Sequence, residues 1–487
     1  MPAPRSIFSS RYEVGSRLRQ MRRPAPVSVM SSPPTLSWLT ASGIASAKSI
    51  AANAENLAWR HTTPVDRGSG FYGNGHVSFG TVGVTMDGNI GSVCFYTDAP
   101  VIEAKLRYAA TGSDRGKIGL RVDDQEVSVT HSESDVIYLP RYQQTDLLKI
   151  DFGSDAKVGA AIGASVSAGG SGHAVGDILT LTGGTFSTAA KLKVLSVTAG
   201  AVTAATVLEP GSYTAQPTNP VSVGSTTGAG TGATFTLTWG AKNSVRRERK
   251  IELFFSRDTW FQGLNVGQYD TVRPASACGP RVVLIGDSIP SGFHTYRPQA
   301  SFAAQAMAML GVEDWWVSGL PGTGWLTASG SSVKLRDRLS TDINPLKADL
   351  IVIAGFGYND NAQSASPLQT EVETTLSALL AANPMSYVVH IGSFIGNSTG
   401  TPSSALRTAI ATAYTNVADT TRCKFYDPVS LGWFTGGVGG PFSAGTGNAG
   451  FFESSDAIHP HQEGHNHLAT LTAAVIDLAL RDLLIVR

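Results

Sequence analysis

Two short segments, far apart in the chain, hold the residue types that acyl transfer requires. GDS at 286–288 ends in a serine, and DAIHP at 456–460 has an aspartate three residues before a histidine. Pro460 pushes His459 out of the helical region, and the short separation lets Asp456 reach the imidazole Nδ1. A serine nucleophile, a histidine base oriented by a carboxylate, and N–H donors are the parts of such a site.

Two further segments offer the N–H donors. Gly322 lies in SGLPGTGW at 318–325, where a glycine leaves its backbone amide free to approach a ligand. Asn359 lies in GYND at 357–360 and carries a side-chain amide. The alternatives are an ordinary tight turn around Gly322, a turn role for Asn359 and a helix N-cap role for Ser288.

A second serine competes with Ser288 for the role of nucleophile. GNSTG at 396–400 matches the G-x-S-x-G pattern, in which the serine sits on a sharp turn between a strand and a helix. Ser398 is instead followed by TGTPSS, which is typical of a loop. We therefore favour Ser288 over Ser398.

The histidines that follow His459 raise the question of a metal site. His461, His465 and His467 lie at the start of a predicted helix, where two of them share a face. A metal needs converging ligands, and no Asp, Glu or Cys elsewhere is spaced to complete such a set. We expect one catalytic histidine with bystanders, and neither a metal nor another cofactor; a metal cluster is the alternative.

Apolar strands alternate with amphipathic helices after about residue 279. This order is typical of a parallel sheet covered by helices on both faces, in which ligands bind at the carboxyl ends of the strands. Each candidate segment follows a predicted strand. The strands are RVVLIGDS, DWWVSGL, ADLIVIAGFG, YVVHIGSF and CKFYDP, and the helices include QASFAAQAMAML, LQTEVETTLSALLAA and SALRTAIATAYTNVA.

The first half of the chain has the patterns of all-β structure. VIEAKLRYA and KIGLRVDD alternate apolar and polar residues, which predicts an antiparallel β-sandwich over 61–158 and 242–277. A Gly/Thr-rich segment at 159–241 is predicted to be a small inserted β module, with a flexible linker as the alternative. Residues 1–60 are predicted to be an arginine-rich arm with one helix in ASGIASAKSIAANAENLAWR, and 279–487 the α/β domain.

Composition limits the classes of partner. Lys and Arg total 37 and so do Asp and Glu, which argues against nucleic acid or an anionic membrane as the main partner. Three scattered cysteines predict no disulfide framework. No apolar run has the length of a signal peptide or of a membrane span, so we expect neither.

The four segments together resemble those of the SGNH hydrolases, also called GDSL esterases. They occur in the order typical of that family over about 210 residues, although the second segment lacks the Asn that often precedes its Gly. The resemblance implies a three-layer α/β/α fold with a flavodoxin-like sheet and a metal-free hydrolase of ester bonds. It implies Ser288 as nucleophile, His459 as base with Asp456, and an oxyanion hole from Ser288, Gly322 and Asn359.

The remaining domains suggest a more specific role. A jelly-roll-like β-sandwich before such a domain resembles the arrangement of carbohydrate esterases, and Asp287, Trp325 and Tyr358 are candidate substrate contacts. The Gly/Thr-rich module resembles one found in bacteriophage tail proteins. Together these resemblances imply a tail or tailspike protein, located in the virion, that removes O-acetyl groups from bacterial surface polysaccharide.

Several features of that role stay open at this point. The arginine-rich arm is a candidate for binding other tail proteins, and a homotrimer is compatible with the resemblance. A general SGNH esterase or lipase acting on small or lipid esters is one alternative function. A non-catalytic glycan-binding virion protein is another.

Overall fold

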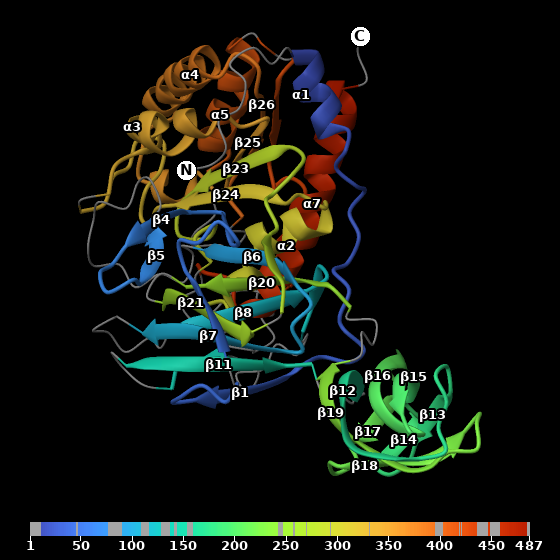
Figure 1. Ribbon diagram of the computed structural model, residues 1–487. Helices are drawn as coiled ribbons and strands as arrows, with labels where there is room; N and C mark the ends of the chain where they lie inside the picture. Colours follow the sequence, from blue (N-terminus) through green and yellow to red (C-terminus); the bar gives the residue numbers. More distant parts are fainter. Residues whose placement is uncertain are drawn as a thin grey trace. The chain divides into compact units, whose positions relative to one another are not determined.

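The C-terminal part of the chain is built on a parallel sheet with strand order β24-β23-β25-β26-β27 (Figure 1). The computed structural model describes residues 11–44, 47–75, 90–108, 116–127, 137–140, 144–152, 159–241, 247–256, 259–268, 270–292, 294–330, 332–394, 403–417, 419, 421–435, 447–448 and 458–484. The strand that comes first in the chain lies between the second and the third, which is the flavodoxin-like order. The predicted strands are confirmed as β23 (Arg281–Gly286), β24 (Asp314–Gly319), β25 (Leu350–Ala354), β26 (Tyr387–Ile391) and β27 (Cys423–Tyr426).

Helices cover both faces of this sheet because its strands are apolar on both sides. Val282 and Leu284 pack in one core with α1, α2 and α7, whereas Val283 and Ile285 pack in a second core with α3, α4 and α5. This alternation produces three layers, α/β/α. The helices are α1 (Arg11–Leu18), α2 (Phe302–Met309), α3 (Leu335–Arg338), α4 (Ala365–Ala382), α5 (Ser404–Asn416) and α7 (Gln462–Leu484).

In the described residues, two seven-stranded sheets make up the β-rich part that precedes this domain. The rings of Phe255 and Phe261, one from each sheet, stack at 5.4 Å between centroids, so the sheets pack face to face. One sheet contains β1 (Thr35–Leu39), β2 (Ala47–Ala51), β4 (Thr63–Asp66), β5 (Tyr72–Gly75), β7 (Val101–Tyr108), β11 (Thr145–Asp151) and β21 (Thr259–Gly267). The other contains β3 (Ala58–Arg60), β6 (Gly91–Thr97), β8 (Lys117–Val122), β9 (Gln125–Glu126), β10 (Ile137–Tyr138), β20 (Arg249–Phe255) and β22 (Val272–Pro274).

The helix predicted within residues 41–60 is wrong. This segment contains β2, which pairs with β21, and β3, which pairs with β6. Alanine has the highest intrinsic helix propensity, but propensity is a small effect per residue, and pairing with neighbouring strands overrides it here. The strands Thr35–Leu39, Ala47–Ala51 and Ala58–Arg60 therefore belong to the sandwich, although we predicted residues 1–60 as an arm.

Arginines of the N-terminal segment bind the α/β domain of the same chain. Arg17 Nε donates to Asp349 Oδ1 at 2.9 Å, and Arg22 Nε donates to the carbonyl of Met309 at 2.9 Å, at the C-terminal end of α2. Val14 and Leu18 of α1 are buried in the domain core. This segment thus lies along the α/β domain, held by both charge and apolar packing.

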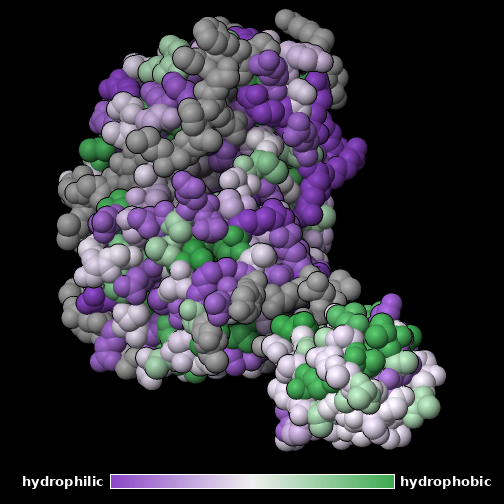
Figure 2. Space-filling model, in the orientation of Figure 1, coloured by the Kyte–Doolittle hydropathy of each residue, from purple (hydrophilic) through white to green (hydrophobic). Residues whose placement is uncertain are grey.

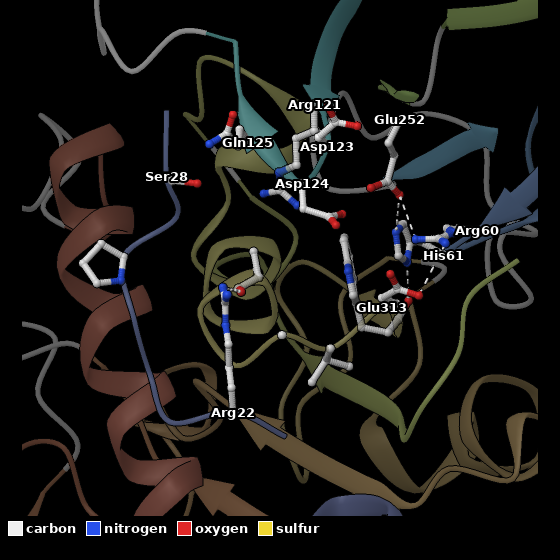
Figure 3. A pocket seen from close by; sticks show the side chains of 15 residues that line it. Arg22, Ser28, Arg60, His61, Arg121, Asp123, Asp124, Gln125, Glu252 and Glu313 are labelled. Atoms are coloured by element: carbon white, nitrogen blue, oxygen red, sulfur yellow. Dashed lines mark hydrogen bonds and ion pairs between the residues drawn. The ribbon is translucent and has the colours of Figure 1, made fainter. Parts of the chain in front are cut away.

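A polar cluster joins the sandwich to the start of β24. The His61 ring stacks on Trp315 at 3.7 Å between centroids, and its nitrogens bond to the Trp315 carbonyl (2.8 Å) and to Glu252 Oε1 (3.2 Å). Arg60 forms ion pairs with Glu252 and Glu313 across the same contact (Figure 3). These residues line a pocket of about 420 Å³ at the amino-terminal end of the parallel strands, so the pocket is distinct from the predicted catalytic end.

The inserted β segment belongs to a second compact unit, Asp98–Pro100 and Asp151–Glu248. Its eight antiparallel strands surround their own apolar core. Few side chains between 159 and 241 are charged, and its surface is largely white and green in Figure 2. The strands are β12 (Gly159–Ser171), β13 (Ile178–Leu181), β14 (Thr185–Thr188), β15 (Lys191–Thr198), β16 (Ala201–Glu209), β17 (Ser212–Ala215), β18 (Val221–Thr226) and β19 (Thr231–Ala241).

None of the described helices combines the length and the apolar character that a transmembrane helix needs.

Candidate active site

Ser288 and His459 meet at the carboxyl end of the parallel sheet. Ser288 lies in the turn that follows β23, and His459 precedes α7, at a distance of 171 residues in the sequence. His459 Nε2 lies 2.7 Å from Ser288 Oγ, within hydrogen-bond distance. This contact lets the imidazole accept the serine proton when Oγ attacks a carbonyl carbon.

The segment after Ser288 and the start of α7 are bonded to each other, which holds the pair in register. The backbone N–H of Tyr296 donates to Gln462 Oε1 at 3.0 Å, and Gln462 Nε2 donates to the carbonyl of Ala300 at 2.9 Å. Gln462 is 1% exposed. The nucleophile and the base are therefore linked by more than their own hydrogen bond.

Two residues named in the sequence analysis lie outside the described residues. Asp456, the predicted partner of the His459 ring, falls in the range 451–457, and Ser398, the competing serine, falls in the range 395–402. Their roles stay predictions.

Gly322 and Asn359 lie in the turns that follow β24 and β25. Gly322 has φ +68°, a conformation that residues with a Cβ rarely adopt. Asn359 Nδ2 donates to the carbonyl of Thr323 at 2.9 Å and to Asp287 Oδ2 at 3.3 Å. Both of its amide hydrogens therefore have an acceptor in this structure, so one must be released, or shared, before Asn359 can bind an oxyanion.

Asp360 ties these two turns together, and the sequence analysis did not single it out. Its side chain is buried, and it accepts the backbone N–H groups of Trp325 (2.8 Å), Leu326 (3.1 Å) and Thr327 (3.0 Å), as well as the Thr327 hydroxyl (2.9 Å). One carboxylate thus fixes the turn of Gly322 relative to the turn of Asn359. The only sequence signal was an acidic residue directly after the candidate Asn.

The side chain of Asp287 is turned into the protein interior. The residue is 2% exposed, and its carboxyl group accepts the N–H of Ile289 at 3.0 Å in addition to the Asn359 amide. Burial raises the pKa of this carboxyl to about 7, against the opposing effects of the Ile289 N–H and the charges of His459 and Arg338. The predicted substrate contact is therefore wrong, because both carboxyl oxygens face protein groups.

The predicted substrate contact of Trp325 is also wrong. Its side chain is 0% exposed and packs against the rings of Phe356 (5.8 Å) and His390 (5.3 Å) in the core. A residue with no exposed surface cannot stack on a sugar. Tyr358 is only partly buried, so its contact with substrate stays a prediction.

The three histidines after His459 take part in separate contacts. His465 is buried, and its Nδ1 accepts the N–H of Phe302 at 3.2 Å. His467 Nε2 lies 2.9 Å from the carbonyl of Trp433, and His461 Nδ1 lies 2.9 Å from Glu463. Within the described part of the chain, no group of three or more His, Cys, Asp or Glu residues is placed to hold a metal ion.

Comparisons with known proteins identify the family that the α/β domain matches. Residues 284–467 match the model of the family described as GDSL-like lipase/acylhydrolase. No curated protein sequence matches the chain.

Similar folds occur among solved structures. A salicylyl-acyltransferase from a tetracycline biosynthetic pathway aligns with 90% of this chain and 100% of its own, at 12% identity and a TM-score of 0.50. A family two carbohydrate esterase from Cellvibrio japonicus aligns with 93% of this chain and 99% of its own (11%, 0.48). An acetyl xylan esterase from the rumen bacterium Butyrivibrio proteoclasticus aligns with 92% and 99% (12%, 0.44). The first likeness shows a shared fold over both the β-rich part and the α/β domain.

Proposed function

Since residues 284–467 form a GDSL-like lipase/acylhydrolase domain, we propose that this protein removes O-acetyl groups from bacterial surface polysaccharide as a serine esterase. The domain makes the protein a carboxylic ester hydrolase. The acetyl group and the polysaccharide are our inference. The observation that carries the catalytic part is the 2.7 Å contact between Ser288 Oγ and His459 Nε2.

The reaction follows from this contact in two steps. Ser288 Oγ attacks the ester carbonyl while His459 Nε2 takes its proton, and the same nitrogen then returns the proton to the leaving alcohol. Water then hydrolyses the acetyl-enzyme with His459 again as base. The N–H groups of Ser288 and Gly322, with the Asn359 amide once it is released, would stabilise the oxyanion, each by about 10²- to 10³-fold in rate.

The support for a sugar ester is the β-sandwich that precedes the domain. Its strand β8 contacts the segment after the nucleophile, since Lys117 Nζ donates to the carbonyl of Thr295 at 3.0 Å. A polymer bound near Ser288 would therefore lie close to the sandwich as well. A lipid substrate would need a long apolar groove.

We also propose that the protein is a component of a bacteriophage tail, in which the N-terminal segment contacts other tail proteins and the chain assembles as a trimer. The support is the composition of the β module, which is rich in Gly and Thr and poor in charge. Electron microscopy of virions labelled with antibody against this chain tests it. Absence of label from particles that contain the chain would contradict a tail location.

The proposed activity is tested by acetate release from a panel of O-acetylated capsular and O-antigen polysaccharides. We expect release by the wild type and by Ser398→Ala, the matched serine control, and none by Ser288→Ala. Hydrolysis of small acetate esters alone, through Ser288, would leave a general esterase and refute the polysaccharide substrate. Activity that survives in Ser288→Ala but not in Ser398→Ala would refute the assignment of the nucleophile.

A further inference from the structure

His294 lies next to the catalytic base, on the segment that follows the nucleophile. Its ring is 6.2 Å from the His459 ring between centroids, and the two planes meet at 70°. The side chain of His294 is exposed, whereas Ser288 is 8% exposed. His294 thus lies at the solvent side of the pair formed by Ser288 and His459.

The backbone at His294 is held in an unfavourable conformation. Its φ is +64°, in the left-handed region that few residues other than glycine adopt. Strained residues persist where the surrounding structure determines them, and they cluster at functional sites. The strain alone proves no role, but it indicates that neighbouring contacts hold the backbone of this segment in place.

Those contacts come from the sandwich and from α7. Lys117 Nζ of β8 donates to the carbonyl of Thr295, and Gln462 accepts the N–H of Tyr296. Gln299, further along the same segment, packs closely on Gly119 of β8. A Cβ atom added to Gly119 would lie 1.7 Å from Gln299 Oε1. The segment that carries His294 is therefore fixed on both sides.

The geometry of ester cleavage determines which part of the bound substrate would lie next to His294. The carbonyl oxygen must point toward the oxyanion donors in the turns of Gly322 and Asn359. The leaving oxygen must lie near His459 Nε2, because it takes its proton from that nitrogen. The alcohol part of the ester therefore lies on the side of His459, where His294 is exposed.

We propose that His294 contacts the leaving alcohol and selects alcohols that carry further hydroxyl groups. An imidazole both donates and accepts hydrogen bonds, and its flat ring packs against a sugar ring. This inference rests on the proposed esterase function and assigns to one residue the recognition of the polyhydroxylated alcohol part of the substrate. His294 is a specificity-determining residue in this proposal, not a proton carrier.

The test compares two acetates that differ in the alcohol alone, an O-acetylated methyl glycoside and ethyl acetate. For His294→Ala we expect kcat/KM on the glycoside to fall by about 3- to 10-fold, the loss of about one hydrogen bond, mostly through KM. Ethyl acetate turnover should change by less than about twofold, because ethanol offers no second hydroxyl group to bind. His294→Asn, which tolerates the left-handed backbone, should retain part of the preference.

Lys347→Ala is the matched control. Lys347 is also exposed and has φ +50°, but it lies before β25, at the opposite end of the strands from Ser288. It should leave both rates unchanged. Equal losses on both acetates in His294→Ala would overturn the specificity role, while a wild type that cleaves ethyl acetate but no acetylated glycoside would refute the carbohydrate substrate itself.

Discussion

Asp287 carries its carboxyl group inside the turn that presents Ser288, where burial raises its pKa to about 7. The ordinary pKa of an aspartate is about 4. Between about pH 4 and pH 7 the folded chain therefore keeps a proton at this site that the unfolded chain releases. Because the folded state binds the additional proton, the contribution of Asp287 to stability falls as pH rises through this window.

Replacing Asp287 by Asn removes this titration while keeping the size of the side chain. We expect the melting temperature of Asp287→Asn, relative to that of the wild type, to rise between about pH 5 and pH 7 and to level off above about pH 8. Thermal unfolding followed across this range, with exposed Asp66→Asn as the control, measures the effect. Parallel curves for wild type and Asp287→Asn would contradict a raised pKa.

Individual site residues were predictable where the chemistry itself demands a residue type. Ser288 and His459 were identified from motif and position after a strand, and the structure places them in contact. Trp325 and Asp287 were misassigned, because a motif does not say on which side of a turn a side chain lies. That depends on packing against segments distant in sequence, such as His390 beside Trp325.

At the scale of elements, the two turns of the predicted oxyanion hole depend on one carboxylate. Asp360→Ala would leave the N–H groups of Trp325, Leu326 and Thr327 without their acceptor, at about 1–3 kcal/mol each. We expect the free energy of unfolding to fall by about 3 kcal/mol or more. We also expect kcat to fall by about 10²-fold, as the donors at Gly322 and Asn359 lose their positions.

Denaturant unfolding and ester hydrolysis per folded molecule measure the two effects separately. Asp360→Asn serves as the matched variant, because it keeps the volume and one acceptor oxygen and should lose less of both. Full kcat in a folded but destabilised Asp360→Ala would mean that Asp360 supports the fold without positioning the donors.

Some of the helices and strands could be predicted from the sequence, and others could not. The parallel strands were identified correctly because they are continuous apolar runs followed by amphipathic helices, a signal that lies within each segment. The strands within residues 41–60 were not identified, because β2 and β3 form by pairing with β21 and β6, which are far away in sequence. Asp360 escaped notice for a similar reason, since its four hydrogen bonds reach residues more than thirty positions earlier.

At the scale of the whole molecule, the β module belongs to a compact unit of its own. Its first and last strands, β12 and β19, pair with each other, and Gly159 lies opposite Ala241. The chain therefore enters and leaves the module at adjacent points. We expect a variant in which residues 160–240 are replaced by a short Gly/Ser linker to fold and to hydrolyse ethyl acetate within about twofold of the wild-type rate, since loops tolerate such changes at small entropic cost.

Circular dichroism and ester hydrolysis of the shortened chain test this expectation. Ser288→Ala in the same background is the control for residual activity. A shortened chain that folds but has lost ethyl acetate hydrolysis would mean that the module contributes to the catalytic domain.

The position of the module also sets the order in which the molecule can form during synthesis. Strand β20 lies between β6 and β8 in its sheet, and it leaves the ribosome only after the entire module. Until then β6 and β8 lack their shared neighbour and expose unpaired edges, which attract other chains. The module has an apolar core of its own, so we expect it to fold before β20 has emerged. A delay in its folding would therefore lengthen the time in which nascent chains are prone to aggregate.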